Sequence, residues 1–155
     1  MWTDTPEGRQ VVSDLTKEIV ADFAVEELDI ADELLDDYYA NPAPHNKPKD
    51  SPLGFGSDAL AAVTPVVAMV FQALFNFVLA EAWTSIQKEG AEMIAKKIKG
   101  MFNPEHKKEE PALGLNQQQL NKAKQLIKKE AMHGGMSAQK AEALALKIVG
   151  RMALA

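Results

Sequence analysis

The residues that could carry out chemistry are few in this sequence, and their spacing does not favour an enzyme. The chain of 155 residues has no cysteine, which excludes thiolate nucleophiles and cysteine-ligated metal sites within it. Its three histidines, His45, His106 and His133, form no spacing such as HExxH that would place two imidazoles on one helix face. His133 precedes Gly134 at a predicted helix end, where an imidazolium interacts well with the helix dipole. We therefore expect no catalytic residue, no cofactor and no metal ion.

The densest group of potential oxygen ligands is Asp32, Glu33, Asp36 and Asp37. These acids do not follow the spaced pattern of an EF-hand loop, so a solvated helix face explains them better than a calcium site. The sequence contains no GxxxxGK[ST] phosphate loop and no GxSxG nucleophile turn. No motif argues for an acid–base pair.

The C-terminal region is rich in bases and raises the question of nucleic-acid binding. It contains Lys122, Lys124, Lys128, Lys129, Lys140, Lys147 and Arg151. A short turn before a second helix has the outline of a helix-turn-helix motif. The second predicted helix, however, begins Ser137-Ala138-Gln139-Lys140 and is rich in alanine, so few of its side chains could read bases. A docking hairpin is the preferred interpretation, and nucleic acid is not expected as a partner.

The elements that position these residues are all predicted to be helices. No useful stretch occurs in which apolar and polar residues alternate, the pattern that would indicate a β-strand. Thr5-Pro6-Glu7 is typical of a helix start, with a capping threonine and a proline in the first turn. Apolar residues then recur at helical spacing through the acidic segment 1–40. Whether this segment is one helix or two, with a break near Val25, is left open. The apolar positions are Val11, Val12, Leu15, Ile19, Phe23, Leu28, Ala31, Leu34, Leu35 and Tyr38.

Four further regions follow. Residues 41–56 contain repeated proline and glycine, which predicts a linker. Residues 57–102 are predicted to form the central helical region, a long helix that is apolar and then amphipathic and that Ser57 or Asp58 could cap. Residues 103–114 form a charged linker. Residues 115–155 predict a helical hairpin, with an Asn116/Gln119 capping box and a turn at Gly134-Gly135. The sequence thus predicts an all-α fold.

The charges are divided unevenly along the chain. Residues 1–40 contain twelve acids and two bases, a net charge of −10, whereas residues 41–155 have a net charge of +5. Opposite charges of this kind can attract one another within a chain or between chains. Solvated helix faces would produce the same composition.

The most informative feature is an uncharged run of 22 residues from Ala59 to Ala80. A membrane span needs about 20 apolar residues, so the run is long enough. Thr64-Pro65, however, is typical of a new helix start, and the 16 residues from Pro65 to Ala80 would extend only about 24 Å. This length is shorter than a hydrocarbon core of about 30 Å.

The membrane hypothesis takes a specific form. The helix would insert as an oligomer. Gln72 and Asn76 lie four residues apart, so their amides share one face, which would contact neighbouring copies of the helix or a water-filled lumen. Bulky side chains would face lipid, and Trp83 would lie at the interface. Lys88, Lys96, Lys97 and Lys99 would contact anionic head groups. The bulky residues are Val70, Phe71, Leu74, Phe75, Phe77, Val78 and Leu79.

The alternative is a wholly soluble helical adaptor or complex subunit in which residues 66–82 form the buried core. A helix that is apolar on every side is also typical of the centre of a helical bundle. The acidic helices and the hairpin are available to cover it.

Several stretches together resemble a known group of proteins. They are Phe55-Gly56-Ser57-Asp58, Thr64-Pro65-Val66-Val67, the lysine-rich stretch from Ile94 to Phe102, Gln119-Leu120, and Ala145 to Gly150. This pattern resembles small uncharacterised helical accessory proteins of bacterial conflict and cell-death systems, over about two thirds of the chain. The resemblance implies a membrane-perturbing or adaptor component and transfers no catalytic residue.

These patterns predict a non-enzymatic protein that acts through its apolar helix, by membrane insertion or self-association. The acidic segment would dock to a protein or hold the apolar helix covered by pairing with the lysines of residues 88–99, and the hairpin would be a second contact module. The expected partners are a membrane, other copies of the chain, or proteins that bind these two segments. The amino terminus has no signal-peptide pattern, so we expect a cytoplasmic protein, peripheral to the inner membrane or inserted in it.

Overall fold

Six α-helices and two 3-10 helices make up the described part of the computed structural model, which comprises residues 2–40, 62–81, 88–102 and 115–153. No strand occurs among these residues, which confirms the predicted all-α fold. The predicted linkers 41–56 and 103–114 lie outside the described residues. The elements are η1 (Trp2–Asp4), α1 (Pro6–Phe23), η2 (Val25–Ile30), α2 (Ala31–Ala40), α5 (Val63–Glu81), α6 (Ala91–Phe102), α8 (Gln117–His133) and α9 (Ala138–Ala153).

The amino-terminal helix begins as the sequence predicts. The Thr5 hydroxyl accepts a hydrogen bond from the Gly8 amide at 3.1 Å, and Pro6 occupies the first turn of α1. Gly8 also lets η1 fold back onto α1, because a Cβ there would lie 2.2 Å from the Trp2 carbonyl oxygen. The helical segment is interrupted near Val25. The acidic segment forms two α-helices, α1 and α2, that are joined by η2.

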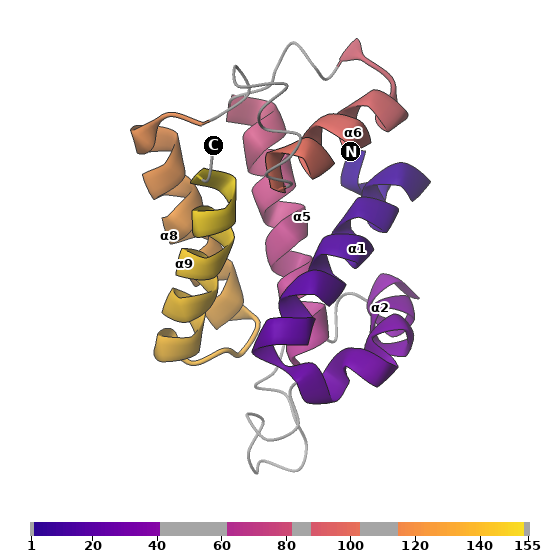
Figure 1. The fold of residues 1–155 in the computed structure, drawn as a ribbon, viewed down its shortest axis with the longest axis vertical. Helices are drawn as coiled ribbons and strands as arrows, with labels where there is room; N and C mark the ends of the chain where they lie inside the picture. Colours follow the sequence, from indigo (N-terminus) through magenta and orange to yellow (C-terminus); the bar gives the residue numbers. More distant parts are fainter. Residues whose placement is uncertain (1, 41–61, 82–87, 103–114, 154–155) are drawn as a thin grey trace.

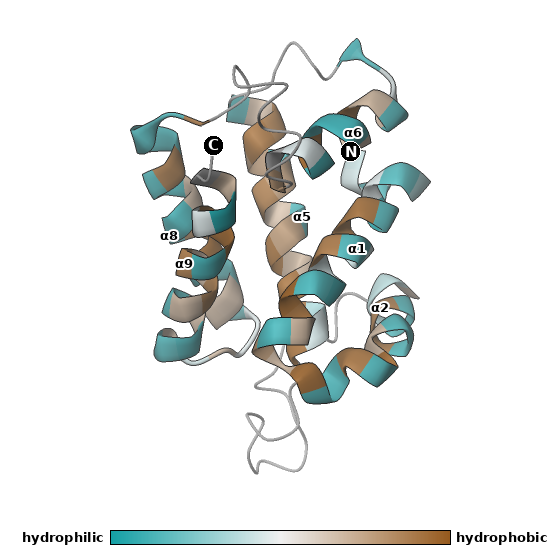
Figure 2. Ribbon diagram, viewed as in Figure 1, coloured by the Kyte–Doolittle hydropathy of each residue, from teal (hydrophilic) through white to brown (hydrophobic). Residues whose placement is uncertain are grey.

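Helix α5 lies at the centre of the arrangement, between two groups of helices (Figure 1). Helices α1 and α2 pack on one side, and the α8–α9 hairpin packs on the other. Apolar residues run along most of α5, whereas the outer helices alternate between polar and apolar residues (Figure 2). Twelve of the 19 residues of α5 are buried. The amphipathic outer helices therefore direct their apolar faces toward α5.

The C-terminal hairpin follows its sequence signals closely. Asn116 and Gln119 form the predicted reciprocal capping box at the start of α8. Gly135 adopts φ 103° in the turn, a conformation that favours glycine. The Ser137 hydroxyl accepts a hydrogen bond from the Lys140 amide at 3.2 Å at the start of α9. The apolar residues of the hairpin that recur at helical spacing are buried: Ala123, Ile127, Ala131, Ala141, Leu144, Ala145, Ile148 and Met152.

The predicted 57–102 region contains two helices in the described structure, α5 and α6. Gly90 precedes α6, and its carbonyl oxygen accepts hydrogen bonds from the amides of Met93 and Ile94. Glycine is a poor helix former, so a helix start is favoured beyond it. The amphipathic helix α6 buries Ile94 and Ile98, which are 4% and 0% exposed.

Candidate functional site

The apolar side chains that the sequence singled out on α5 are brought together in one core. Val70, Phe71, Leu74, Phe75, Val78 and Leu79 are each at most 5% exposed, and Phe77 is partly buried against them. The Phe71 and Phe102 rings lie 5.8 Å apart, and the Trp2 and Phe75 rings lie 6.0 Å apart. Both pairs are edge-to-face, a favourable geometry for aromatic rings. Trp83 lies outside the described residues.

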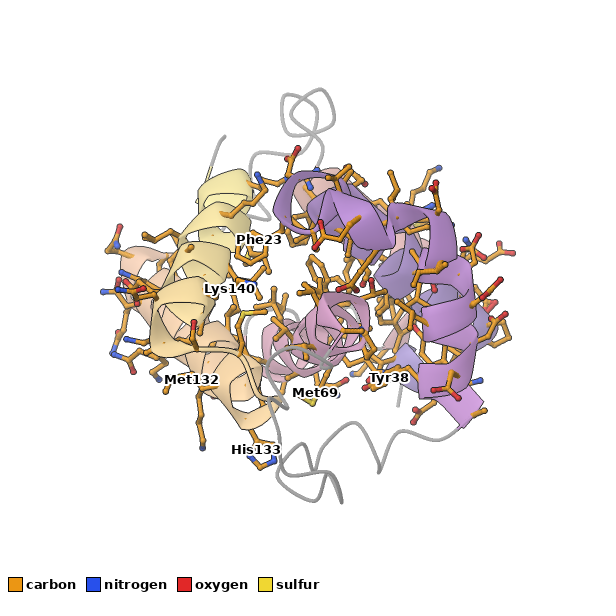
Figure 3. All side chains as sticks on the ribbon, turned by 90° about the horizontal axis from the view of Figure 1, so that it is seen from below. Phe23, Tyr38, Met69, Met132, His133 and Lys140 are labelled. Carbon is orange, nitrogen blue, oxygen red and sulfur yellow. The ribbon has the colours of Figure 1, made fainter. Side chains whose placement is uncertain are left out.

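The polar face of α5 contacts the N-terminal cover, by which we mean residues 2–40. The Gln72 side-chain oxygen accepts a hydrogen bond from the Tyr38 hydroxyl, and the Asn76 oxygen accepts one from the Thr3 hydroxyl at 3.2 Å. Tyr38 lies on the α2 side of α5 (Figure 3). Both amides were predicted to face neighbouring copies of the helix or a lumen within a membrane, whereas in the structure each is hydrogen-bonded within the chain, to a residue of α2 or η1.

Tyr38 gives this contact a pH dependence. It is 3% exposed, and burial raises its pKa from 10.0 to about 12. Because the folded state holds the phenol proton more tightly, stability is fully present below pH 10 and falls as the pH rises toward 12. We expect a loss of about 2–3 kcal/mol in the free energy of unfolding over this range. Urea denaturation at pH 9 and pH 12 measures it.

The matched variant is Tyr38→Phe, which keeps the ring and removes the ionisable group. We expect this variant to be less stable than the wild type at pH 9, because Gln72 loses its partner, but to lose less stability at high pH. Lysine deprotonation affects both proteins equally and cancels in the comparison. Identical pH slopes for the two proteins would show that the Tyr38 hydroxyl is not buried in solution.

Glu27 of η2 caps the start of α5. Its carboxylate accepts hydrogen bonds at 2.8 Å from the amides of Val63 and Thr64 and from the Thr64 hydroxyl. A helix N-terminus has unpaired amides and a positive dipole end, so a carboxylate there is stabilising. The sequence predicted a cap from Ser57 or Asp58, both of which lie outside the described residues. It gave no indication of Glu27, which is 36 residues from Val63.

Three acids of α1 form ion pairs with the later, basic part of the chain. Their spacing of four residues places them on one helix face. We call these pairs the acidic seam: Asp14 with Lys99 at 3.3 Å, Glu18 with Arg151 at 2.8 Å, and Asp22 with Lys147 at 2.9 Å. The Lys147 ammonium also holds the pKa of Asp22 below its usual value. The seam joins the N-terminal cover to α6 and α9.

The predicted basic flank contributes only in part to this seam. Lys99 pairs with Asp14, whereas Lys88 and Lys96 are exposed and Lys97 is half-buried. The other two bases of the seam, Lys147 and Arg151, were assigned from sequence to the surface of the hairpin. Arg151 also donates a hydrogen bond to the Phe102 carbonyl oxygen at 3.3 Å.

The described residues hold no group of three or more His, Asp or Glu side chains close enough to bind a metal ion. His133 is exposed and is the last residue of α8, next to the turn of the hairpin (Figure 3). A cavity of about 260 Å³ lies between the first turn of α5 and the α8–α9 turn, with Val63, Val66, Met136 and Lys140 among its lining residues. Neither feature places an acid–base pair or a nucleophile in a recognisable catalytic geometry.

Helix α5 is the one helix among the described residues that is long and apolar enough to cross a membrane, and most of it is buried within the bundle. Length and composition alone do not separate a membrane span from a core helix. Comparisons of the chain with protein families, with curated proteins and with solved structures found no match. The function is therefore inferred from the packing around α5 and from the surface of the bundle.

Proposed function

We propose that this protein is a soluble, non-enzymatic helical adaptor or complex subunit, with α5 as its structural core and its outer helices as contact surfaces for other proteins. The observation that supports this proposal is the coverage of α5 by helices of its own chain. Both polar side chains of its Gln72/Asn76 face have partners in the N-terminal cover.

Energetics favour this state over insertion of α5 in a bilayer. Lipid tails are about as apolar as a protein core, so transfer of α5 into lipid adds little burial for α5 itself. The same transfer would expose the apolar faces of α1, α8 and α9 to water, at about 25 cal/mol for each Å². It would also remove Tyr38 and Thr3 from Gln72 and Asn76.

The test is the state of the purified protein without detergent. We expect a monomer of 16.9 kDa by light scattering, a single cooperative melting transition, and no flotation with liposomes. Formation of large assemblies or a need for detergent would contradict the adaptor proposal. Protein that floats with liposomes and resists a carbonate wash would contradict it as well.

A second candidate function is membrane insertion or self-association after release of α5. It is favoured by the length and composition of α5 and by the acidic seam, which attaches the N-terminal cover through ionic contacts on the surface. In this scheme the seam is a latch, and weakening it exposes the apolar helix.

Neutralising the seam separates the two candidates. The variant Asp14→Asn/Glu18→Gln/Asp22→Asn removes all three pairs, and Glu26→Gln/Glu33→Gln/Asp36→Asn makes the same change in charge at exposed positions outside the seam. The adaptor proposal expects both variants to remain monomeric, with a small loss of stability in the first, since exposed ion pairs contribute little. The latch scheme expects only the first variant to float with liposomes or to form large assemblies.

A further inference from the structure

Helix η2 exposes an unusual concentration of apolar side chains. Val25 is 65%, Leu28 is 38% and Ile30 is 45% exposed, and η2 buries none of its six residues. Residues three apart are aligned in a 3-10 helix, so Val25 and Leu28 lie one above the other, about 6 Å apart along the axis. Figure 2 shows apolar residues at this bend between α1 and α2. Ile30 follows Leu28 by two residues, so it lies on a neighbouring side of η2, in line with Glu27, and is still 45% exposed. We call the three exposed apolar residues Val25, Leu28 and Ile30 the η2 patch.

The outward orientation of the η2 patch is fixed by the core. Glu27 belongs to the same short helix, and its carboxylate is held on the first turn of α5 by three hydrogen bonds. Rotation of η2 to bury Val25 or Leu28 would break these bonds. A 3-10 helix of six residues is longer than the usual three or four, so this conformation needs such tertiary contacts.

The surroundings of the η2 patch are strongly acidic. Residues 25–40 contain seven acids and no lysine or arginine. Glu26 and Asp29 are exposed beside the patch, and Glu33 and Asp36 are exposed on α2. This charge would repel an anionic lipid surface. A symmetric contact between two copies would bring identical acidic surfaces together, which is also unfavourable.

We propose that the η2 patch and its acidic surroundings dock a cationic amphipathic helix of a partner protein, with aliphatic side chains on one face and lysine or arginine beside them. The apolar side chains of the partner would cover Val25, Leu28 and Ile30, and its bases would contact Glu26 and Asp29. From Val25 to Ile30 the patch extends about 10 Å along η2, which matches about two turns of an α-helix. This inference rests on the proposed function, since a soluble bundle must present the surface.

The probe is a labelled peptide of about 14 residues with leucine at helical spacing and lysine elsewhere. Its binding to the full chain is measured by fluorescence anisotropy at about 0.15 M salt. We expect Val25→Ser/Ile30→Ser to weaken binding roughly tenfold, because two apolar contacts are lost. The matched control, Met132→Ser/Leu146→Ser, removes two apolar side chains that are 45% and 54% exposed on α8 and α9. We expect it to bind within about twofold of the wild type.

A second pair of variants tests the charge. Glu26→Gln/Asp29→Asn should weaken binding and reduce its salt dependence. The control Glu89→Gln/Glu92→Gln, which alters exposed acids just before α6 and in its first turn, should do neither. A peptide of lysine alone should bind weakly. The proposal fails if the lysine peptide binds as tightly as the amphipathic peptide, or if Val25→Ser/Ile30→Ser binds like the wild type. Either result would mean that the peptide is held by non-specific charge attraction and not by the η2 patch.

Light scattering on the same samples identifies two other outcomes. A dimer that Val25→Ser/Ile30→Ser converts to monomer would assign the η2 patch to a second copy of the chain and overturn the proposed partner. A stable monomer that does not bind the amphipathic peptide would overturn the docking surface alone. Aggregation without detergent would instead contradict the soluble adaptor.

Discussion

Replacing Leu74 with lysine is expected to destabilise the protein strongly and to reduce the amount of soluble monomer. Leu74 is 0% exposed in the middle of α5. A lysine there would keep its charge without water or lose its proton, and both routes cost several kcal/mol. We expect a loss of about 4 kcal/mol or more, against a total stability of about 5–15 kcal/mol for a domain of this kind. Circular dichroism melting and gel filtration measure the change.

The matched control is Leu146→Lys, because Leu146 is 54% exposed on α9. It adds the same charge to the surface, and we expect its melting temperature and elution to resemble those of the wild type. Liposome flotation with a carbonate wash makes the comparison decisive for function. If the wild type floats and resists the wash while Leu74→Lys stays folded in solution, then α5 acts in the bilayer and the adaptor proposal is wrong.

The features that sequence predicted well are those set by neighbouring residues. The Thr5-Pro6 start, the Asn116/Gln119 capping box and the Gly134-Gly135 turn each depend on a few adjacent positions. The apolar faces of α8 and α9 follow from helical spacing in the same way. Local backbone chemistry thus determines the helices and their caps before any tertiary contact is known.

The environment of α5 could not be decided from composition. A buried core helix and a membrane span both need apolar residues on all sides, and 19 residues are long enough for either. In the structure α5 is covered by α1, α2 and α8, and Gln72 and Asn76 have hydrogen-bond partners within the chain. Those contacts join residues far apart in the chain.

The acidic seam was predicted only in outline. The charge division along the chain left open whether the acidic segment pairs with later bases or faces solvent, and in the structure Asp14 pairs with Lys99. Lys147 and Arg151 could not be identified, because the position of α9 relative to α1 depends on how each helix packs around α5. The helical spacing of Asp14, Glu18 and Asp22 was visible in the sequence and marks one face, but spacing alone does not name partners.

Removal of the Glu27 carboxylate is expected to destabilise the protein although its neighbours on η2 are exposed. Glu27→Ala would leave the amides of Val63 and Thr64 and the Thr64 hydroxyl without their acceptor. Unpaired donors of this kind cost about 1–3 kcal/mol each when buried, and solvent can satisfy part of this set. We expect a total loss of about 2–3 kcal/mol in the free energy of unfolding, measured by urea denaturation at neutral pH.

Two further variants separate the cap from the general acidity of η2. Glu26→Ala removes an exposed carboxylate one residue away and should leave the urea midpoint close to that of the wild type. Glu27→Gln retains one oxygen acceptor without the charge, so its stability should lie between those of Glu27→Ala and the wild type. Equal midpoints for Glu26→Ala and Glu27→Ala would mean that the carboxylate does not cap α5 in solution. The orientation of the η2 patch would then lose its physical basis, because the same three hydrogen bonds hold Val25 and Leu28 toward solvent.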